Sequence, residues 1–297
     1  MFRLGVIGLS PGNGHPYSWA AICNGYNADA MADCPFPAIP AYLGARRFPE
    51  DAIQDARVEA VWCQDRAVAE HVARAARIER VVERPTDLLD GLDAILLARD
   101  DAENHRAFAE PFLNAGLPVF IDKPLGVRLA DADTLLDLQR DPAQIHSCSA
   151  FRYIPDLPPA ASALPKLGRI CRVDAEIGKA WATYAVHVLE PAVRLLNAIE
   201  PPAHANVDQD DGATTLTASW HDGRTLRAAT LGIGAPPVFR IEGEHDTMSL
   251  QIDDPFFYFR TAIEAFVEQM RTGTVQIPRE QTRATVRLIE RGMQERG

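Results

Sequence analysis

Residues 117–125 read Leu-Pro-Val-Phe-Ile-Asp-Lys-Pro-Leu, a short apolar run that ends in an acid, a lysine and a proline. The run Val119–Ile121 has the composition of a strand that is buried on both faces. Proline lacks an N–H group and biases the preceding residue toward an extended backbone. We therefore expect Lys123 at the carboxyl end of a strand, which is the edge where open α/β sheets bind ligands.

Lysine is scarce in this chain. Of the 30 basic residues only Lys123, Lys166 and Lys179 are lysines, and Lys123 is the only lysine among the first 150 residues. An ammonium group can shift its pKa and pass a proton, whereas a guanidinium stays charged. This makes Lys123 a candidate catalytic residue. The alternative is a strand-end lysine that caps a backbone carbonyl.

The overall composition narrows the class of protein. A length of 297 residues suits two domains, and a net charge of −11 argues against nucleic acid or an anionic membrane as partner. No apolar run approaches the ~20 residues that cross a bilayer, and the first residues resemble a strand more than a signal peptide. The five cysteines form no Cys-x-x-Cys pair and no metal-ligand spacing, so we expect a cytoplasmic protein without a metal site.

The first 150 residues alternate strand and helix signals, which is typical of a parallel sheet with crossover helices. Strands are expected at Arg3–Gly8, Val58–Gln64, Arg80–Glu83, Asp93–Ala98, Val119–Ile121 and Gln144–Tyr153. Helices are expected at His15–Asn24, Ala67–Arg77, Asn104–Ala115 and Leu129–Arg140, with a helical turn at Thr86–Asp90. The segment Gly25–Glu59 is predicted to be an irregular insertion, too long for an ordinary connection.

The second half has a different pattern, so we predict an α/β chain with one domain at 1–150 and an α+β domain at 151–297. Strands are expected at Ile170–Ile177, Ala213–Trp220, Thr225–Leu231, Val238–Gly243 and Thr247–Ile252. Helices are expected at Tyr184–Asn197, Phe257–Thr272 and Glu280–Gly292. This order indicates a mostly antiparallel sheet with helices on one face. The proline-rich residues 155–159 are the candidate hinge.

A glycine-rich loop follows the first strand and precedes a helix, which is the context of a dinucleotide-binding loop. Its candidate cofactor-binding residues are Gly8, Ser10, Gly12, Asn13, Gly14 and His15. Ser10 occupies the position of the second glycine in the Gly-x-Gly-x-x-Gly pattern, so a Gly/Pro-rich turn is the alternative. An acid, Asp65, closes the next strong strand, where it can accept hydrogen bonds from a ribose. Asp65 can instead cap the following helix. A carboxylate there favours NAD over NADP, although Arg66 leaves NADP possible.

Residues 78–125 resemble the Gfo/Idh/MocA oxidoreductase family, in the order strand, Leu-Leu-Asp-Gly-Leu-Asp-Ala-Ile-Leu-Leu-Ala, polar residues, His105, helix and Leu-Pro-Val-Phe-Ile-Asp-Lys-Pro-Leu. The resemblance continues to Arg152-Tyr153. It implies an N-terminal Rossmann domain, a C-terminal α/β sheet domain, a nicotinamide cofactor and a sugar or polyol substrate. On this resemblance Lys123 matches the lysine of the family's Glu-Lys-Pro motif, with Asp122 in place of the glutamate.

The resemblance also assigns two histidines. His105 matches a histidine near the nicotinamide ribose, and His187 matches the histidine of the family's Asp-x-x-x-His-x-x-Asp helix. In this chain Thr183 and Glu190 replace the two acids, and threonine cannot exchange a proton at neutral pH. The run Ala98-Arg99-Asp100-Asp101 replaces a more common threonine-proline, which adds charge where the nicotinamide is expected.

We expect His187 to act as general base because the pKa of histidine lies near neutrality, and Lys123 to stabilise the alkoxide. Tyr153 or Tyr184 could supply the donor that Thr183 cannot, and Arg152 and Thr183 are expected to contact substrate. His187 could instead be a half-buried histidine bonded to a carbonyl. Two other functions stay open: a glycoside-cleaving enzyme that uses bound NAD transiently, and a ligand-sensing protein without catalysis. We also expect a homodimer or homotetramer, because the second sheet is predicted to leave one apolar face uncovered.

Overall fold

The structure, a computed structural model, describes residues 1–155, 157, 166–252 and 254–294. The chain forms two compact units that interleave along the sequence. Unit 1 contains residues 1–122, 135–147 and 254–276, and unit 2 contains the described residues of 123–134, 148–253 and 277–297. A single boundary near residue 150 therefore does not separate the units. Of the expected hinge at 155–159, residues 156, 158 and 159 lie outside the described part.

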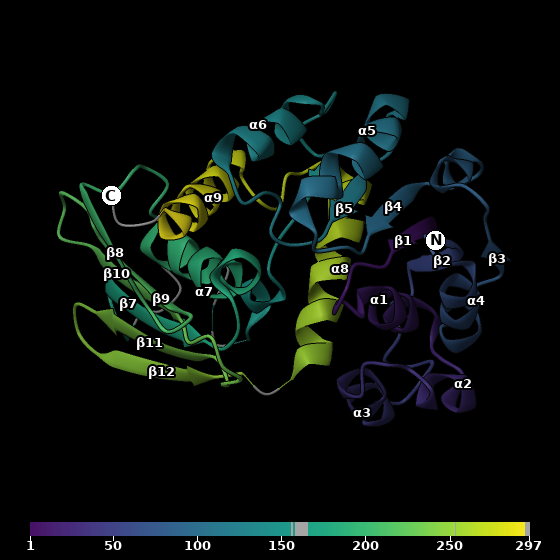
Figure 1. The fold of residues 1–297 in the computed structure, drawn as a ribbon, viewed down its shortest axis with the longest axis horizontal. Helices are drawn as coiled ribbons and strands as arrows, with labels where there is room; N and C mark the ends of the chain where they lie inside the picture. Colours follow the sequence, from purple (N-terminus) through teal and green to yellow (C-terminus); the bar gives the residue numbers. More distant parts are fainter. Residues whose placement is uncertain (156, 158–165, 253, 295–297) are drawn as a thin grey trace. The chain divides into compact units, whose positions relative to one another are not determined.

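Unit 1 contains a six-stranded parallel sheet in the order β3-β2-β1-β4-β5-β6 (Figure 1). The strands are β1 (Phe2–Gly8), β2 (Ala56–Cys63), β3 (Arg80–Val81), β4 (Ala94–Leu97), β5 (Val119–Ile121) and β6 (Ile145–His146). Every residue of β4 and β5 is buried, as the continuous apolar runs predict for strands covered on both faces. The predicted α/β fold with a parallel first sheet is confirmed.

The helices of unit 1 come from both ends of the chain. The longer ones are α1 (His15–Asn24), α4 (Arg66–Ala75), α5 (His105–Ala115) and α8 (Pro255–Thr272), with short 3₁₀ turns η1 (Pro85–Leu89) and η2 (Ala102–Asn104). Helix α8 is bound to the edge of the sheet by Gln269, whose amide donates to the carbonyls of Ala143 and Ile145 at 2.8 and 3.0 Å. The Phe266 ring lies 5.6 Å from the Phe120 ring of β5. These contacts explain why a late segment belongs to the first sheet.

The expectation of an irregular segment at Gly25–Glu59 is wrong. It contains two short helices, α2 (Ala28–Ala32) and α3 (Ala38–Gly44), and the start of β2. The side chain of Asn27 accepts hydrogen bonds from the N–H groups of Asp29 and Ala30 and so caps α2. Neither helix is long enough to give a clear apolar period in the sequence.

The expected strand at Gln144–Tyr153 is present but much shorter than predicted. Strand β6 covers two residues, and the chain then forms a 3₁₀ turn, η3 (Ala150–Tyr153). Ser149 caps this turn, because its Oγ accepts a hydrogen bond from the N–H group of Phe151 at 3.1 Å. The helix α6 (Leu129–Asp137) precedes β6 and contributes residues to both units.

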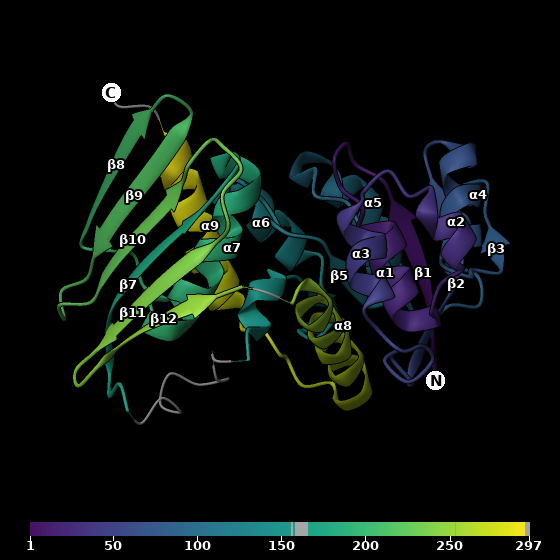
Figure 2. The same cartoon turned by 90° about the horizontal axis from the view of Figure 1, so that it is seen from below.

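Unit 2 contains a second six-stranded sheet in the order β12-β11-β7-β10-β9-β8. Its strands are β7 (Ile170–Ile177), β8 (His204–Asp210), β9 (Ala213–Ser219), β10 (Thr225–Thr230), β11 (Val238–Gly243) and β12 (Thr247–Gln251). Only the pair β7–β10 is parallel, so the predicted mostly antiparallel sheet is confirmed. The helices α7 (Trp181–Leu196) and α9 (Arg279–Met293) lie on one face of this sheet (Figure 2). The edge strand β8 is absent from the sequence-based expectation.

The opposite face of the second sheet is polar, so the expectation of an uncovered apolar face is wrong. On β7 the inward residues Val173, Ala175 and Ile177 are buried, and they alternate with outward charged residues such as Arg172 and Asp174. Threonine, serine and arginine occupy the corresponding outward positions of β9 and β10. No helix of unit 2 in the described part of the chain covers this face.

Candidate active site

The loops after β1, β2, β4 and β5 gather at the carboxyl edge of the sheet of unit 1. The chain places β2 on one side of β1 and β4 on the other, so the strand order reverses between β1 and β4. Open parallel sheets bind ligands at the carboxyl end of such a pair. The predicted loop 8–15, together with Asp65, Asp100 and Asp122, lies at this edge.

The glycines of the loop after β1 serve two purposes. Gly12 has φ +80°, a conformation that L side chains rarely adopt, and no heavy atom lies within 4 Å of where a Cβ would stand. A Cβ on Gly8 would come within 2.3 Å of Pro16, and one on Gly14 within 2.6 Å of Ile39. Gly12 therefore sets the backbone, whereas Gly8 and Gly14 allow close packing.

Backbone donors remain in this loop. In the part of the chain that the structure describes, the N–H groups of Ser10, Gly12 and Gly14 donate no hydrogen bond. The first turn of α1 offers fewer donors than expected, since His15 N–H donates to Asn13 Oδ1 at 2.7 Å and Pro16 has no N–H. An anion at this edge would therefore be held by the loop amides more than by the helix N-terminus.

Asn13, His15 and Asp122 form one buried group. Asp122, at the end of β5, is 1% exposed, and its Oδ2 accepts hydrogen bonds from Asn13 Nδ2 at 2.8 Å and from His15 Nδ1 at 2.5 Å. The His15 ring stacks on Trp19 with centroids 4.9 Å apart. These contacts join the loop after β1 to the end of β5 and fix the residue that precedes Lys123.

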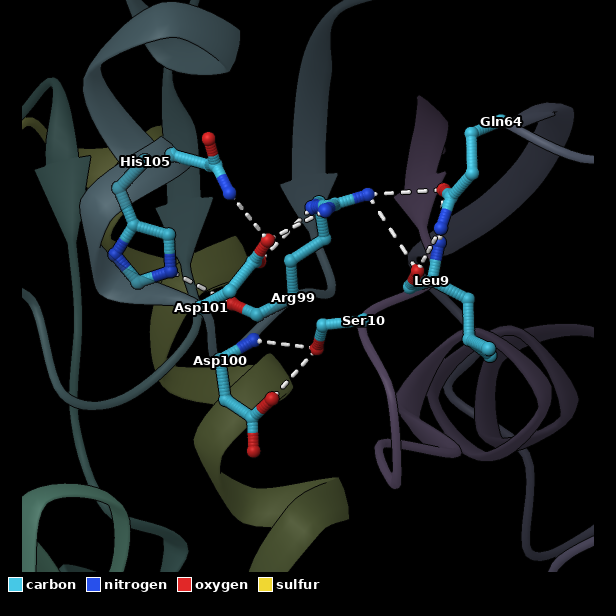
Figure 3. Close-up of polar contacts among 8 residues, drawn as sticks. Leu9, Ser10, Gln64, Arg99, Asp100, Asp101 and His105 are labelled. Atoms are coloured by element: carbon cyan, nitrogen blue, oxygen red, sulfur yellow. Dashed lines mark hydrogen bonds and ion pairs between the residues drawn. The ribbon is translucent and has the colours of Figure 1, made fainter.

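A second network crosses the edge between β1 and β4 (Figure 3). The guanidinium of Arg99 donates to both oxygens of Asp101, at 2.9 and 2.5 Å, and to Gln64 Oε1 at 2.9 Å. The Gln64 amide accepts from the N–H group of Leu9 and donates to its carbonyl. Arg99 and Asp101 thus form an ion pair, and Arg99 ties the loops after β1, β2 and β4 together.

Two further predicted residues lie in this network. Asp100 accepts a hydrogen bond from Ser10 Oγ at 2.5 Å, and its own N–H donates to that Oγ at 3.1 Å. His105 is fully buried, and its Nε2–H donates to the Arg99 carbonyl at 2.7 Å. Burial alone would raise the pKa of the Asp101 carboxyl, but hydrogen bonds from Arg99 and Asn104 outweigh burial and lower that pKa below its usual value.

Asp65 is exposed at the start of α4. Its Oδ1 accepts a hydrogen bond from the N–H group of Ala67 at 2.8 Å, so the helix-capping interpretation is realised. The second carboxylate oxygen makes no hydrogen bond to described residues, which leaves the ribose interpretation compatible with the cap. Arg66 forms ion pairs with Glu70 and Glu83.

The residues of this edge fit a dinucleotide cofactor. The amides of Ser10, Gly12 and Gly14 would hold the pyrophosphate, and the carboxylate of Asp65 would accept hydrogen bonds from the adenosine ribose. Ala98, at the end of β4, is fully buried, and its N–H donates to the Ile7 carbonyl. Ala98 therefore belongs to the buried part of the sheet next to this edge.

Unit 2 brings together three of the predicted catalytic residues. Lys123 is 5% exposed, and its Nζ lies 5.5 Å from the centroid of the Tyr184 ring. The ring of Tyr184 lies 5.3 Å from that of His187, which is 9% exposed. Tyr184 and His187 are three positions apart on α7 and share one face of the helix. An ammonium, a phenol and an imidazole thus form one cluster.

Behind this cluster lies a buried polar chain. Ser149 Oγ lies 2.8 Å from His187 Nδ1, and the Ser149 N–H donates to Glu190 Oε2 at 2.5 Å. Arg152 donates to Glu190 Oε1 at 3.2 Å and to Gln281 at 2.7 Å. Burial raises the pKa of the Glu190 carboxyl, although Arg152 opposes that rise. Arg152, predicted to contact substrate, here holds Glu190.

The remaining predicted residues, Tyr153 and Thr183, have separate environments, and so does Arg194, which the sequence analysis did not single out. Tyr153 lies in η3, and burial raises its pKa well above the ordinary value. In the described chain no ring contact or hydrogen bond joins Tyr153 to Tyr184 or His187. Arg194 donates to the carbonyls of Arg152 and Leu157, and burial, followed by the charge of Arg152, lowers its pKa to about 10. Thr183 is partly exposed in the first turn of α7.

Sequence reasoning did not single out three residues of these sites: Gln64, Ser149 and Lys179. Lys179 Nζ donates to Tyr184 Oη and lies 4.3 Å from the centroid of its ring. Lysine scarcity was a signal for Lys179, since two of the three lysines in the chain meet one tyrosine. Ser149 and Gln64 gave no signal, because their roles depend on contacts with residues 38 and 55 positions away.

Among the described residues, no three His, Cys, Asp or Glu side chains could hold a metal ion together. All five cysteines are free thiols. No helix in the described ranges has the length and apolar character needed to span a membrane.

One family model matches part of the chain. Residues 41–147 match the model of the Gfo/Idh/MocA oxidoreductases, described as an oxidoreductase family with an NAD-binding Rossmann fold. The matched range begins in α3 and runs through β6, so it includes Arg99, Asp122 and Lys123. No curated protein sequence matches the chain.

Solved structures resemble the chain over nearly its full length. A UDP-N-acetylglucosamine 3-dehydrogenase from Acidithiobacillus ferrooxidans aligns with a TM-score of 0.71 and 15% identity, covering 98% of this chain and 96% of its own. A scyllo-inositol dehydrogenase from Lactobacillus casei aligns with a TM-score of 0.69 and 13% identity, covering 97% of this chain and 94% of its own. A biliverdin reductase from Synechocystis, solved with biliverdin and NADP⁺, aligns with a TM-score of 0.67 and 15% identity, covering 97% of each chain. At these identities the likeness establishes the fold.

Proposed function

We propose that this chain is a member of the Gfo/Idh/MocA oxidoreductase family and an NAD(P)-dependent dehydrogenase that interconverts a secondary alcohol and a ketone on a sugar, a polyol or a sugar derivative. The match of residues 41–147 to that family's model supports this proposal. The strand order of unit 1 is that of a dinucleotide-binding sheet. Oxidation of an alcohol also needs a group that takes the hydroxyl proton and donors that stabilise the developing alkoxide.

The cluster of Lys123, Tyr184 and His187 is the observation that carries this proposal. A nearly buried ammonium is costly to desolvate, and a merely structural site would be served by the arginine that this chain otherwise prefers. All three side chains have hydrogens to donate or can accept one near neutral pH. The cluster therefore has the groups that bind and protonate an oxygen.

When bound, the nicotinamide accepts the hydride from the alcohol carbon or returns it to the ketone carbon. Lys123 Nζ and His187 Nε2 would bind the substrate oxygen. The Tyr184 hydroxyl, which accepts a hydrogen bond from Lys179, would be the third donor to that oxygen. Lys123 follows Asp122 directly in the chain, so one peptide bond joins the buried Asp122 group to the lysine.

The substrate class is proposed from chemistry and from likeness together. Two of the structurally similar proteins are named as dehydrogenases of an inositol and of a nucleotide sugar. Both substrates are rings with several hydroxyl groups. The partly exposed hydroxyl groups of Thr183 and Tyr184, on the helix that carries His187, suit hydrogen bonding to such a ring.

Two further features belong to the proposal. NAD is the preferred cofactor, because Asp65 would repel a 2′-phosphate and Arg66 is already paired with Glu70 and Glu83. The protein is a homodimer or homotetramer joined through the second sheet. Its outward face holds a depression of about 610 Å³ lined by Arg172, His204, Thr217 and Arg227, so we expect polar contacts there in place of apolar ones.

The test is turnover. The purified protein would be offered NAD or NADP with a panel of inositols, aldoses, polyols and nucleotide sugars, and reduced cofactor would be followed by absorbance. Sustained production of NADH with one of them supports the proposal. Glycoside cleavage without net NADH would overturn it in favour of transient oxidation. Tight binding of NAD and NADH with no turnover on any compound would overturn it in favour of a sensor.

A further inference from the structure

The hydrogen-bond partners of the Ser149 hydroxyl determine where its hydrogen points. The residue is 0% exposed, and in the described chain its Oγ has two partners, the N–H group of Phe151 at 3.1 Å and Nδ1 of His187 at 2.8 Å. A hydroxyl has one hydrogen to donate and two lone pairs that accept. Phe151 N–H can only donate, so it occupies one lone pair. The single hydroxyl hydrogen then has one acceptor within reach, which is Nδ1 of His187.

From this count we infer that Ser149 is a positioning residue that keeps the hydrogen of neutral His187 on Nε2. A neutral imidazole carries one N–H, and an Nδ1 that accepts a hydrogen bond cannot be the protonated nitrogen. The opposite tautomer would give the Ser149 oxygen two donors and leave its own hydrogen buried without an acceptor, which is unfavourable. The role of this hydrogen rests on the proposed dehydrogenase function. In that function, His187 donates a hydrogen bond from Nε2 to the substrate oxygen.

The backbone of Ser149 is itself fixed to the helix that carries His187. The Ser149 N–H donates to Glu190 Oε2 at 2.5 Å, and Glu190 lies three residues after His187 on α7. Arg152 of η3 binds the other oxygen of Glu190 at 3.2 Å. The backbone N–H of Ser149 thus binds Glu190 and its hydroxyl binds His187, and both partners lie on α7. These two contacts hold the hydroxyl toward Nδ1 in one orientation.

Two cationic side chains meet the tyrosine that packs against His187. Lys123 and Lys179 both lie near the Tyr184 ring, and Arg152 of η3 binds Glu190. Glu190, an acid one turn after His187 on α7, is bound to Arg152 and to the Ser149 N–H. Position 183, one turn before His187, holds a threonine and so offers no carboxylate to stabilise an imidazolium.

With this assignment Lys123, and not His187, transfers the proton. In the reducing direction the ketone oxygen gains its proton from the Lys123 ammonium, which becomes an amine, and the carbon gains the hydride that the nicotinamide supplies. In the oxidising direction the Lys123 amine takes the hydroxyl proton. His187 donates one hydrogen bond to that oxygen throughout, and it neither gains nor loses a proton.

The experiment reads the tautomer directly, without substrate or turnover. Protein labelled with ¹⁵N-histidine would be recorded by NMR at a pH where His187 is neutral, with a His187→Asn sample to assign its signals. We expect Nε2 of His187 to show the N–H type of shift and Nδ1 the unprotonated type. His105 is an internal reference, because its Nε2 donates to a carbonyl that can only accept. A hydrogen on Nδ1 of His187 in the wild type overturns the inference.

Two variants separate positioning from a general loss of structure. Ser149→Ala removes the donor and should move His187 toward a mixture of tautomers while leaving the His105 signals unchanged. Once a substrate is known, the kcat of Ser149→Ala should fall about 10–100-fold with a smaller change in KM. This is the loss found when a partner that orients a metal-binding histidine is removed. Ser149→Thr keeps the hydroxyl and should restore both readouts. An unchanged tautomer in Ser149→Ala overturns the inference, and absence of any turnover overturns the proposed function while the NMR result stands.

Discussion

The Nζ atom of Lys123 lies 5.5 Å from the centroid of the Tyr184 ring, within the ~6 Å at which an aromatic face attracts an ammonium. The first lysine of the chain is thereby held against the helix that carries His187. This position brings the charge of Lys123 to a phenol whose ring also contacts an imidazole. The predictions for Lys123 and Tyr184 follow from this contact.

Lys123→Arg and Lys123→Ala are expected to fold and to bind NAD like the wild type, but to lose turnover by about 10²–10³ in kcat, the loss seen when one positioned electrostatic donor is removed. Arginine keeps the charge, but its planar group does not release a proton. Steady-state kinetics on the substrate found in the panel would measure this, with calorimetric NAD binding as the control. If Lys123→Arg turns over within a few-fold of wild type, the proton is not carried by Lys123.

Asp65→Asn is expected to weaken NAD binding and to narrow the difference between NAD and NADP. Asparagine is as good a helix cap as aspartate, so the stability of α4 should hardly change. Asp65→Ala, the matched control, removes both functions and should also cost ~1 kcal/mol of stability through the lost cap. Calorimetric titration with both cofactors measures the preference. Tighter NADP than NAD binding by the wild type would contradict the ribose role of Asp65.

Asp101 should contribute to a pH dependence of stability. Its pKa is lowered in the folded protein, because hydrogen bonds from Arg99 and Asn104 outweigh burial. The unfolded carboxyl titrates near its ordinary ~3.9, so the stabilisation is complete above about pH 4 and is lost as the pH falls through the lower folded pKa. Asp101→Asn should therefore be less stable near neutrality and should lose less stability on acidification. Chemical unfolding between pH 3 and about 7 would test this, and parallel curves for both proteins would refute it.

The sequence predicts the parallel sheet well, because strands buried on both faces are continuous apolar runs. Strand β5 is found at the expected residues Val119–Ile121. The edge strand β8 escapes detection because Val207 is its only buried residue, so no alternation is visible. The expected strand after Gln144 ends early because Ser149 and Glu190 offer the backbone other hydrogen bonds. Such competition depends on tertiary contacts, which a single sequence does not reveal.

The candidate site divides in the same way. Lysine scarcity and the position after a buried strand single out Lys123 without any structure. The family resemblance adds His187, and the Asp65 cap is one of the two roles expected for that acid. The contact between Ser149 and His187 spans 38 residues and has no local signature. The assignment of α8 to unit 1 likewise depends on Gln269 meeting two carbonyls more than 120 residues earlier.

The assembly prediction can be tested with surface charges. Light scattering at micromolar concentration should give the mass of a dimer or tetramer. Arg227→Glu, on the outward face of β10, should weaken the assembly by reversing a charge beside Glu176. Arg106→Glu, an exposed change on α5 of unit 1, is the matched control and should leave the mass unchanged. A monomeric wild type would contradict assembly through this sheet.

The three lysines of the chain offer a test of Tyr184. Lys179 donates to Tyr184 Oη, so Lys179→Met should remove a charged hydrogen bond to a side chain that the proposal places at the substrate. A hydrogen bond to a charged group is worth about 1.5–3 kcal/mol, which corresponds to a loss of ~10–100-fold in kcat/KM if the bond is needed in the transition state. Lys166→Met is the matched control, because Lys166 is exposed in a turn and is the one lysine not at this tyrosine. Tyr184→Phe should show a comparable loss, and the Lys179→Met/Tyr184→Phe double variant should be little worse than either alone, since both changes delete the same interaction. Additive losses in the double variant would show that Lys179 acts independently of Tyr184.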